Sequence, residues 1–128
     1  MDKRTVQTTQ APAAIGPYSQ GVVAGGWLFV SGQLGLDPQT GQLVPGGVQA
    51  ETEQALRNLR AIVQAAGGDL RHVVKVTVYL RDMADFAAMN EVYARFFADQ
   101  PPARAAIQAA ALPKGAAVEI EAVAYLGD

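Results

Sequence analysis

Two amphipathic segments constrain the fold of this chain more than any other feature. Between Val48 and Ala66, apolar residues recur every three or four positions, which predicts a helix that Gly67 and Gly68 end. A second helix is predicted after Asp82, which can cap it, and before the Pro101-Pro102 pair that ends it. Each helix therefore has one apolar face that a sheet can cover. In the second helix this face gathers Phe86, Met89, Tyr93, Phe96 and Phe97.

Strands are predicted before, between and after these helices. The β-branched run from His72 to Leu80 indicates the strand between them, and the Gly25-Gly26 pair indicates a hairpin turn. Residues 11–20 contain prolines and a glycine, so we expect an ordered loop there. The other strands are expected at about residues 4–8, 27–34, 104–111 and 118–126. This order predicts a two-layer α+β fold, in which a mixed sheet of about six strands carries both helices on one face.

Composition narrows the classes of function. The length of 128 residues favours a single domain over residues 1–128. Ten Lys and Arg against twelve Asp and Glu give a net charge of −2, without the basic surface typical of nucleic-acid binders. The absence of cysteine excludes disulfides and thiol nucleophiles, and a single histidine disfavours a His-based metal site. No signal peptide or membrane-spanning stretch is evident, so we expect a cytoplasmic chain.

The alternation of side chains in two strands predicts how the sheet is used. The apolar residues expected to face the helices are Leu28, Val30, Leu34, Val118, Ile120, Ala122 and Ala124. The opposite face mixes aromatic with polar residues, namely Trp27, Phe29, Ser31, Gln33, Glu119, Glu121, Val123 and Tyr125. Because two helices cover one face, this mixed face predicts self-association through the sheet. A monomer with one solvated face is the alternative.

Arg104 is the first candidate for chemistry. Small apolar residues surround it, and its forked donors suit the carboxylate of a substrate. A structural ion pair with Glu119 or Asp99 is an equally open reading. Glu119 and Glu121 share one strand face, where two carboxylates can raise each other's pKa. The single histidine, His72, is expected to be structural.

Five blocks of sequence together resemble one known family. They are residues 11–20 (APAAIGPYSQ) with 31–33 (SGQ), residues 85–90 (DFAAMN), residues 102–104 (PAR), residues 112–114 (LPK) and residues 118–122 (VEIEA). Their order and spacing, from about Thr5 to Ala124, resemble the reactive intermediate deaminase A family (RidA, also called YjgF/YER057c/UK114).

The resemblance implies a chorismate-mutase-like fold that assembles as a homotrimeric barrel, with clefts between the subunits. It also implies hydrolytic deamination of reactive 2-enamine and 2-imine carboxylates, notably 2-aminoacrylate and 2-iminopropanoate, to 2-oxo acids and ammonia. The resemblance further implies that this activity protects pyridoxal-phosphate enzymes. The family uses no metal and no organic cofactor, so the resemblance implies neither for this chain.

The same resemblance assigns roles to residues. Arg104 matches the arginine that grips the substrate carboxylate, and Glu119 matches the carboxylate that positions the attacking water. The family arginine marks its active members. Cleft-lining positions are matched by Tyr18 and Ser31, and Asn90 matches a family position without a defined role.

The chain departs from the family pattern directly after Arg104. The family commonly has Ser, Cys and Glu where this chain has Ala105, Ala106 and Gln108. In the family, the residue at the position of Ala106 contributes its backbone carbonyl to the water, and alanine retains that group. We expect the two alanines to widen the pocket toward imines of longer amino acids.

Two other classes of function remain open at this point. One is a regulatory trimer that binds 2-oxo acids through Arg104 without catalysis. The other is an RNA-directed or translation-inhibiting protein, an activity ascribed to relatives. The net charge of −2 and the single histidine argue against RNA cleavage.

Overall fold

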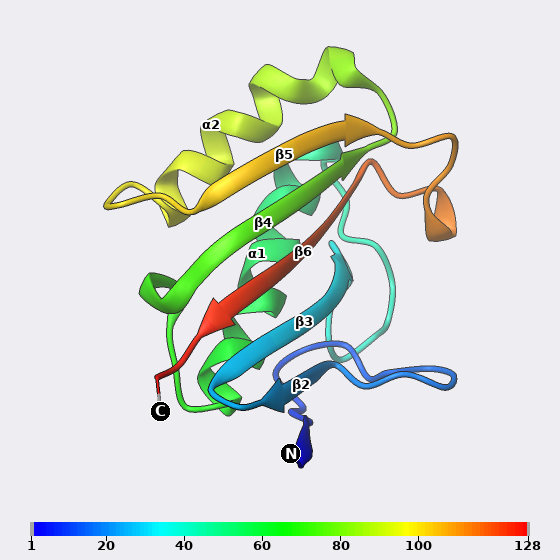
Figure 1. The fold of residues 1–128 in the computed structure, drawn as a ribbon. Coiled ribbons are helices and arrows are strands. Elements are labelled where there is room, and N and C mark those ends of the chain that lie inside the picture. The colour runs from blue at the N-terminus through cyan, green and yellow to red at the C-terminus, as the bar shows by residue number, and fades with distance from the viewer. Residues whose placement is uncertain (1, 128) are drawn as a thin grey trace.

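The computed structural model describes residues 2–127 and contains a six-stranded sheet with two helices on it (Figure 1). The strands are β1 (Lys3–Val6), β2 (Gly21–Ala24), β3 (Trp27–Leu34), β4 (Val73–Leu80), β5 (Ala103–Gln108) and β6 (Val118–Tyr125). The helices are α1 (Gly47–Ala65) and α2 (Phe86–Phe96), and short 3-10 turns lie at Leu70–His72, Met83–Asp85 and Pro113–Gly115. The predicted α+β fold is confirmed.

The sheet is mixed, as the order of elements predicted. Its strands lie in the order β1-β2-β3-β6-β4-β5. Neighbouring strands are antiparallel except β4 and β5, which are parallel and are joined through α2. A parallel pair needs a crossover connection, and the helix supplies it. In consequence β5 forms one edge of the sheet and β1 the other (Figure 1).

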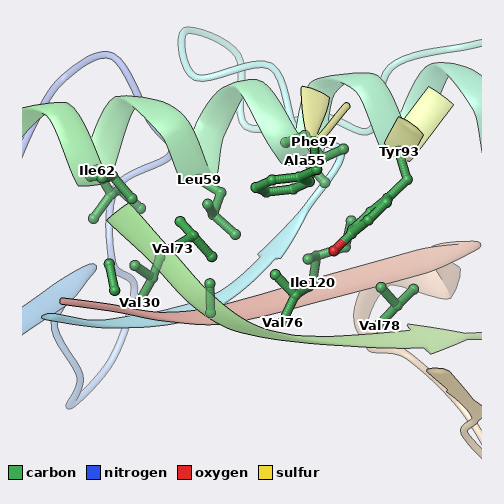
Figure 2. Packing of buried hydrophobic residues seen from close by; sticks show 14 of the residues in the cluster. Val30, Ala55, Leu59, Ile62, Val73, Val76, Val78, Tyr93, Phe97 and Ile120 are labelled. Atoms are coloured by element: carbon green, nitrogen blue, oxygen red, sulfur yellow. The ribbon is translucent and has the colours of Figure 1, made fainter. Parts of the chain in front are cut away.

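Both helices pack on the same face of the sheet and bury its apolar side chains. Figure 2 shows Leu59 and Ile62 of α1, Tyr93 of α2, and Phe97 directly after α2, directed at the strands. Each fully buried side chain of this kind stabilises the fold by about 1.5–3 kcal/mol. The buried residues of the strands include Leu28, Val30, Val76, Val78, Val118 and Ile120.

Glycine marks both ends of α1. Gly46, directly before α1, and Gly47, its first residue, have positive φ angles of 117° and 79°, and Gly67 follows the last turn with a φ of 98°. This left-handed backbone suits glycine and stops a helix. The helix predicted from Val48 to Ala66 is therefore confirmed, with a shift of one residue at each end.

The second helix begins later than the sequence predicted. The Asp82 side chain caps the short Met83–Asp85 turn by accepting a 2.9 Å hydrogen bond from the Ala84 amide, and α2 starts only at Phe86. The strand expected from His72 likewise begins at Val73. The His72 ring instead caps a turn, where its Nδ1 accepts a 2.9 Å hydrogen bond from the Asp69 amide.

A β-bulge in β3 reverses part of the predicted alternation. Up to Val30 the register with β6 is regular, but between Val30 and Gln33 it shifts. Gln33 then pairs with the core residue Ile120, and Leu34 pairs with Glu119. The expectation that Leu34 faces the helices and Gln33 the opposite side is therefore wrong, because one extra residue in a strand exchanges the two faces.

β5 is shorter than predicted. The sequence favours a strand to about residue 111, but β5 ends at Gln108. Its pairing stops because β4 ends at Leu80, whose carbonyl oxygen accepts the last bond, at 2.9 Å, from the Ala109 amide. Residues beyond Ala109 have no neighbouring strand to pair with.

The face of the sheet opposite the helices carries the predicted aromatic residues. Trp27 and Tyr125 stack at 4.7 Å between ring centroids, and half of the Phe29 side chain is exposed. Ile107 of the edge strand β5 is also exposed on this uncovered face, since it pairs with Tyr79. Neither helix of residues 2–127 combines the length and apolar character needed to cross a membrane.

Candidate functional site

The Glu119 side chain lines a cavity. Of the two cavities within residues 2–127 that contain predicted site residues, this one is the larger. This cavity has a volume of about 580 Å³. Its walls come from the 11–20 loop, from the bulged end of β3 and from the turn at Pro113. The predicted residues Tyr18, Ser31 and Glu119 all line it, together with Ile15, Gly32, Leu36 and Lys114.

The Glu119 carboxyl is held in a partly desolvated position. Burial raises its pKa above the ordinary value for glutamate, and the neighbouring Glu121 carboxylate raises it further. Gly32 lies against the carboxylate and leaves no room for a side chain. A carboxyl with a raised pKa can take a proton from a water molecule and return it.

Tyr79, on the neighbouring strand β4, lies close to the carboxylates of Glu119 and Glu121 on β6. It pairs directly with Glu119 across β4 and β6. The pKa of its hydroxyl is raised by burial, by the charge of Glu121 and by a hydrogen bond with Glu121.

Within residues 2–127, no three His, Cys, Asp or Glu side chains form a group that could hold a metal ion.

Ser31 anchors the loop that carries Tyr18. Its hydroxyl donates a 2.5 Å hydrogen bond to the Ser19 carbonyl oxygen, and its amide donates to the Gln20 carbonyl oxygen at 3.0 Å. The hydroxyl is thus already used as a donor within the chain. The Tyr18 side chain is more than half exposed at the mouth of the cavity.

Gln20, like Tyr79, is a site residue that sequence reasoning missed. Its side chain is buried, and its amide nitrogen donates to the carbonyl oxygens of Thr8, Ala11 and Pro12 at 3.0, 3.3 and 2.7 Å. Its side-chain oxygen accepts from the Thr8 amide at 2.7 Å. Four hydrogen bonds therefore hold the irregular loop in place. The sequence signal that could have revealed it is a glutamine directly after a proline-rich loop, because such irregular backbone needs hydrogen-bond partners from side chains.

Arg104 lies on a different part of the sheet. Its Nη1 donates a 2.7 Å hydrogen bond to Asn90 Oδ1. Its guanidinium carbon lies 4.6 Å from the ring centroid of Tyr93 and 5.4 Å from that of Phe86. Of the two readings left open, the structural ion pair is not found, because within residues 2–127 the partners of Arg104 are an amide and two aromatic rings.

The side chains of Arg104 and Glu119 project from opposite faces of the same sheet. Arg104 is in register with Val76, which pairs with Ala122, and both of these face the helices. Glu119 pairs with Tyr79, an odd number of residues from Val76 and therefore on the other face. The β4 strand also lies between them. One chain does not bring the two predicted catalytic side chains together.

Ala106 lies beside Arg104, whereas Ala105 does not. Ala106 pairs with Val78 on the helix side, and Ala105 pairs with Thr77 on the uncovered side. The Ala109 amide donates its hydrogen bond to the Leu80 carbonyl, so the backbone groups of Ala109, and of every second residue before it in β5, face β4. Because these groups alternate, the carbonyl of Ala106 points to the open edge of the sheet. The two alanines therefore lie on opposite faces of β5, and within one chain they do not line one pocket together.

Comparison with known proteins places this chain among relatives of similar sequence and fold. A family model described as endoribonuclease L-PSP matches residues 8–126. A mouse protein named 2-iminobutanoate/2-iminopropanoate deaminase is 57% identical over 125 residues, which cover 98% of this chain and 93% of that protein. The similarity therefore spans all of the site residues described above.

Two solved structures share the fold closely. RidA from an Antarctic Psychrobacter superposes with a TM-score of 0.92 at 52% identity, covering 95% of this chain and 98% of that one. TdcF from E. coli, solved with bound serine, superposes with a TM-score of 0.93 at 44% identity, covering 97% and 99%.

Proposed function

The chain belongs to the endoribonuclease L-PSP family, to which the RidA proteins belong, and we propose that it hydrolyses 2-imino carboxylates to 2-oxo acids and ammonia. Relatives that share more than half of its residues carry the name 2-iminobutanoate/2-iminopropanoate deaminase. The observation that carries the proposal is the half-buried Glu119 carboxyl with a raised pKa at a cavity wall. A carboxyl in this state suits activation of water beside a small substrate.

In the proposed mechanism, Arg104 grips the substrate carboxylate with two parallel charge-assisted hydrogen bonds, worth about 1.5–3 kcal/mol. Glu119 and the Ala106 carbonyl oxygen hold a water molecule at the imine carbon. The oxygen of this water forms a bond to that carbon, and its proton passes to Glu119. Glu119 then returns this proton to the nitrogen. As the carbon–nitrogen bond breaks and ammonia leaves with the electron pair, Glu119 takes the proton of the added hydroxyl group, the carbonyl of the 2-oxo acid forms, and the proton passes to the ammonia.

Little barrier has to be removed in this reaction. The protonated imine is already a strong electrophile, and it also hydrolyses in water. Holding water and substrate in a reactive geometry with modest acid–base help is therefore sufficient, and no covalent nucleophile is needed.

The proposed site is shared between subunits of a homotrimer. Arg104 and Ala106 lie at the free β5 edge, while Glu119 opens on the other face of the sheet. A neighbouring copy that places its β5 edge at the Glu119 cavity completes the site. The uncovered face, with Trp27 and Phe29 exposed, supplies apolar surface for such an assembly.

Mixing two inactive variants tests the shared site. Arg104→Ala and Glu119→Gln are refolded together, so that trimers of mixed composition form. If each cleft takes its arginine and its glutamate from different chains, about a quarter of wild-type activity returns, because the two residues are drawn independently. If both residues act from one chain, every cleft lacks one of them and the mixture stays inactive.

A kinetic assay tests the activity itself. The disappearance of freshly generated 2-iminopropanoate is followed with the chain, with Arg104→Ala and with no protein. The proposal is supported if the imine decays faster with the wild-type chain than with Arg104→Ala or with no protein. Tight binding of a 2-oxo acid with unchanged imine decay would instead identify a regulatory binding protein. Imines made from alanine, leucine and phenylalanine then report the size of side chain that the cleft accepts.

A further inference from the structure

Three residues on one face of α2 surround the guanidinium of Arg104. Phe86, Asn90 and Tyr93 are spaced four and three residues apart, so they lie in one row along the helix. The two aromatic rings contact the guanidinium at 5.4 and 4.6 Å, and the Asn90 oxygen accepts its Nη1 at 2.7 Å. All three contacts come from one helix and act on one cation.

These contacts leave one edge of the guanidinium unoccupied. Nη1 of Arg104 is engaged by Asn90, whereas within residues 2–127 the structure records no hydrogen bond from Nε or Nη2. Nε and Nη2 donate in parallel from one side of the planar group, which matches the two oxygens of a carboxylate. The row on α2 thus decides which edge is free.

The ring of Tyr93 contributes here, and its hydroxyl does not. Tyr93 is about 95% buried, and among residues 2–127 its hydroxyl oxygen has no hydrogen-bond partner. Figure 2 shows that oxygen directed from α2 toward the strands. Burial without a partner costs free energy, so the hydroxyl adds nothing to the contact with the cation. The aromatic face attracts the guanidinium.

We propose that Phe86, Asn90 and Tyr93 are positioning residues that hold Arg104 with its Nε and Nη2 edge free, and that they thereby set the affinity for the substrate carboxylate. This inference rests on the proposed function. The carboxylate is not the reacting group, so its grip is the same in the ground state and the transition state. Weakening it raises KM and leaves kcat unchanged.

Removing either ring tests the proposal. Tyr93→Leu and Phe86→Leu keep an apolar side chain but lose the aromatic face. Each is expected to raise KM by about tenfold, with kcat within about twofold of wild type. Tyr93→Phe keeps the ring and is expected to retain the wild-type KM, which separates the ring from the hydroxyl.

The chain offers a matched control on the same helix. Phe96 of α2 forms a second cation–aromatic contact, with Arg60 of α1 at 5.7 Å. Phe96→Leu removes an equivalent ring without touching Arg104, and its KM is expected to stay unchanged. A rise in KM for this variant as large as that for Phe86→Leu would mean that general loosening of α2 is the cause, and would overturn the proposal.

Asn90→Asp provides a test that does not depend on packing, since the two side chains have nearly the same shape. The new carboxylate pairs with the guanidinium and competes with the substrate, so KM is expected to rise by at least about tenfold. An unchanged KM for Asn90→Asp and for both leucine variants, with thermal unfolding showing that they fold, would overturn the inference.

Pyruvate binding keeps this test separate from that of the proposed function. Titration calorimetry of pyruvate with the wild type and the same variants measures the carboxylate grip without catalysis. Dissociation constants that rise in parallel with KM support the positioning role. If the wild type fails to hydrolyse imines but its pyruvate affinity drops about tenfold in Tyr93→Leu, the proposed activity fails while the positioning role stands.

Discussion

Gly32 of β3 lies directly against the Glu119 carboxylate of β6, so that a Cβ at position 32 would overlap it. The contact occurs within the bulge that shifts the register between Val30 and Gln33. The Gly32 backbone φ is not in the left-handed region, so the space required by Glu119, rather than backbone freedom, is what demands glycine here. The placement of Glu119 therefore depends on the absence of a side chain on the adjoining strand.

Gly32→Ala is expected to lower kcat by about 10²-fold. The added methyl group pushes the Glu119 carboxylate out of place, and a displacement of about 1 Å of a catalytic group lowers the rate by about that factor. Steady-state kinetics on 2-iminopropanoate measure the effect. Gly32→Ala combined with Glu119→Asp shortens the carboxylate and relieves the overlap, so part of the lost rate should return. Full activity of Gly32→Ala alone would show that the contact is unimportant.

Arg104→Ala is expected to raise KM so far that turnover is lost at micromolar substrate, and Arg104→Lys to lose about tenfold or more in kcat/KM. A lysine supplies a point charge but not two parallel donors. Kinetics over a range of substrate concentrations check this. Wild-type efficiency of the lysine variant would rule out the two-pronged contact.

The pH dependence of kcat/KM should reflect the raised pKa of Glu119 and the effect of Glu121 on it. Since burial and the Glu121 charge raise the pKa of Glu119, the acidic limb of kcat/KM is expected above the ordinary pKa of glutamate. Glu121→Gln removes one negative charge and should move that limb to lower pH. Lys114 and Tyr18 line the same cavity and stay unchanged in both proteins. An unmoved limb would mean that another group controls it.

Glu119→Gln is expected to stabilise the fold near neutral pH while it removes activity. The folded-state pKa of Glu119 is raised, so the folded chain binds this proton more tightly than the unfolded chain, and stability falls as pH rises through the window between the ordinary and the raised value. Thermal unfolding should show a higher Tm for Glu119→Gln at neutral pH. The difference should vanish below about pH 3, where the carboxyl is protonated in both states.

Gln20→Leu is expected to destabilise the chain by about 2–4 kcal/mol, because it leaves several loop groups without their hydrogen-bond partners. Denaturant unfolding measures the loss, and hydrogen exchange should quicken in residues 8–19. Gln10→Leu changes an exposed glutamine of the same loop and serves as the control. Equal stability of the two variants would contradict the role assigned to Gln20.

Local patterns predicted most of the elements. The three-and-four spacing of apolar residues identified α1 to within one residue at each end, because one stripe of a helix must be buried. The β-branched run identified β4. The extent of β5 could not be predicted, because it ends where its partner β4 ends, and that limit lies in another part of the chain.

The candidate site divides in the same way. The sequence singled out Arg104 and Glu119, since an arginine among small residues and a spaced pair of glutamates are visible in one dimension. Register across three strands decides on which face each side chain lies, and it places these two on opposite faces. Cross-strand register and the bulge in β3 depend on contacts between distant segments. The composition and periodicity of a single segment therefore do not contain them, and the tertiary structure alone decides them.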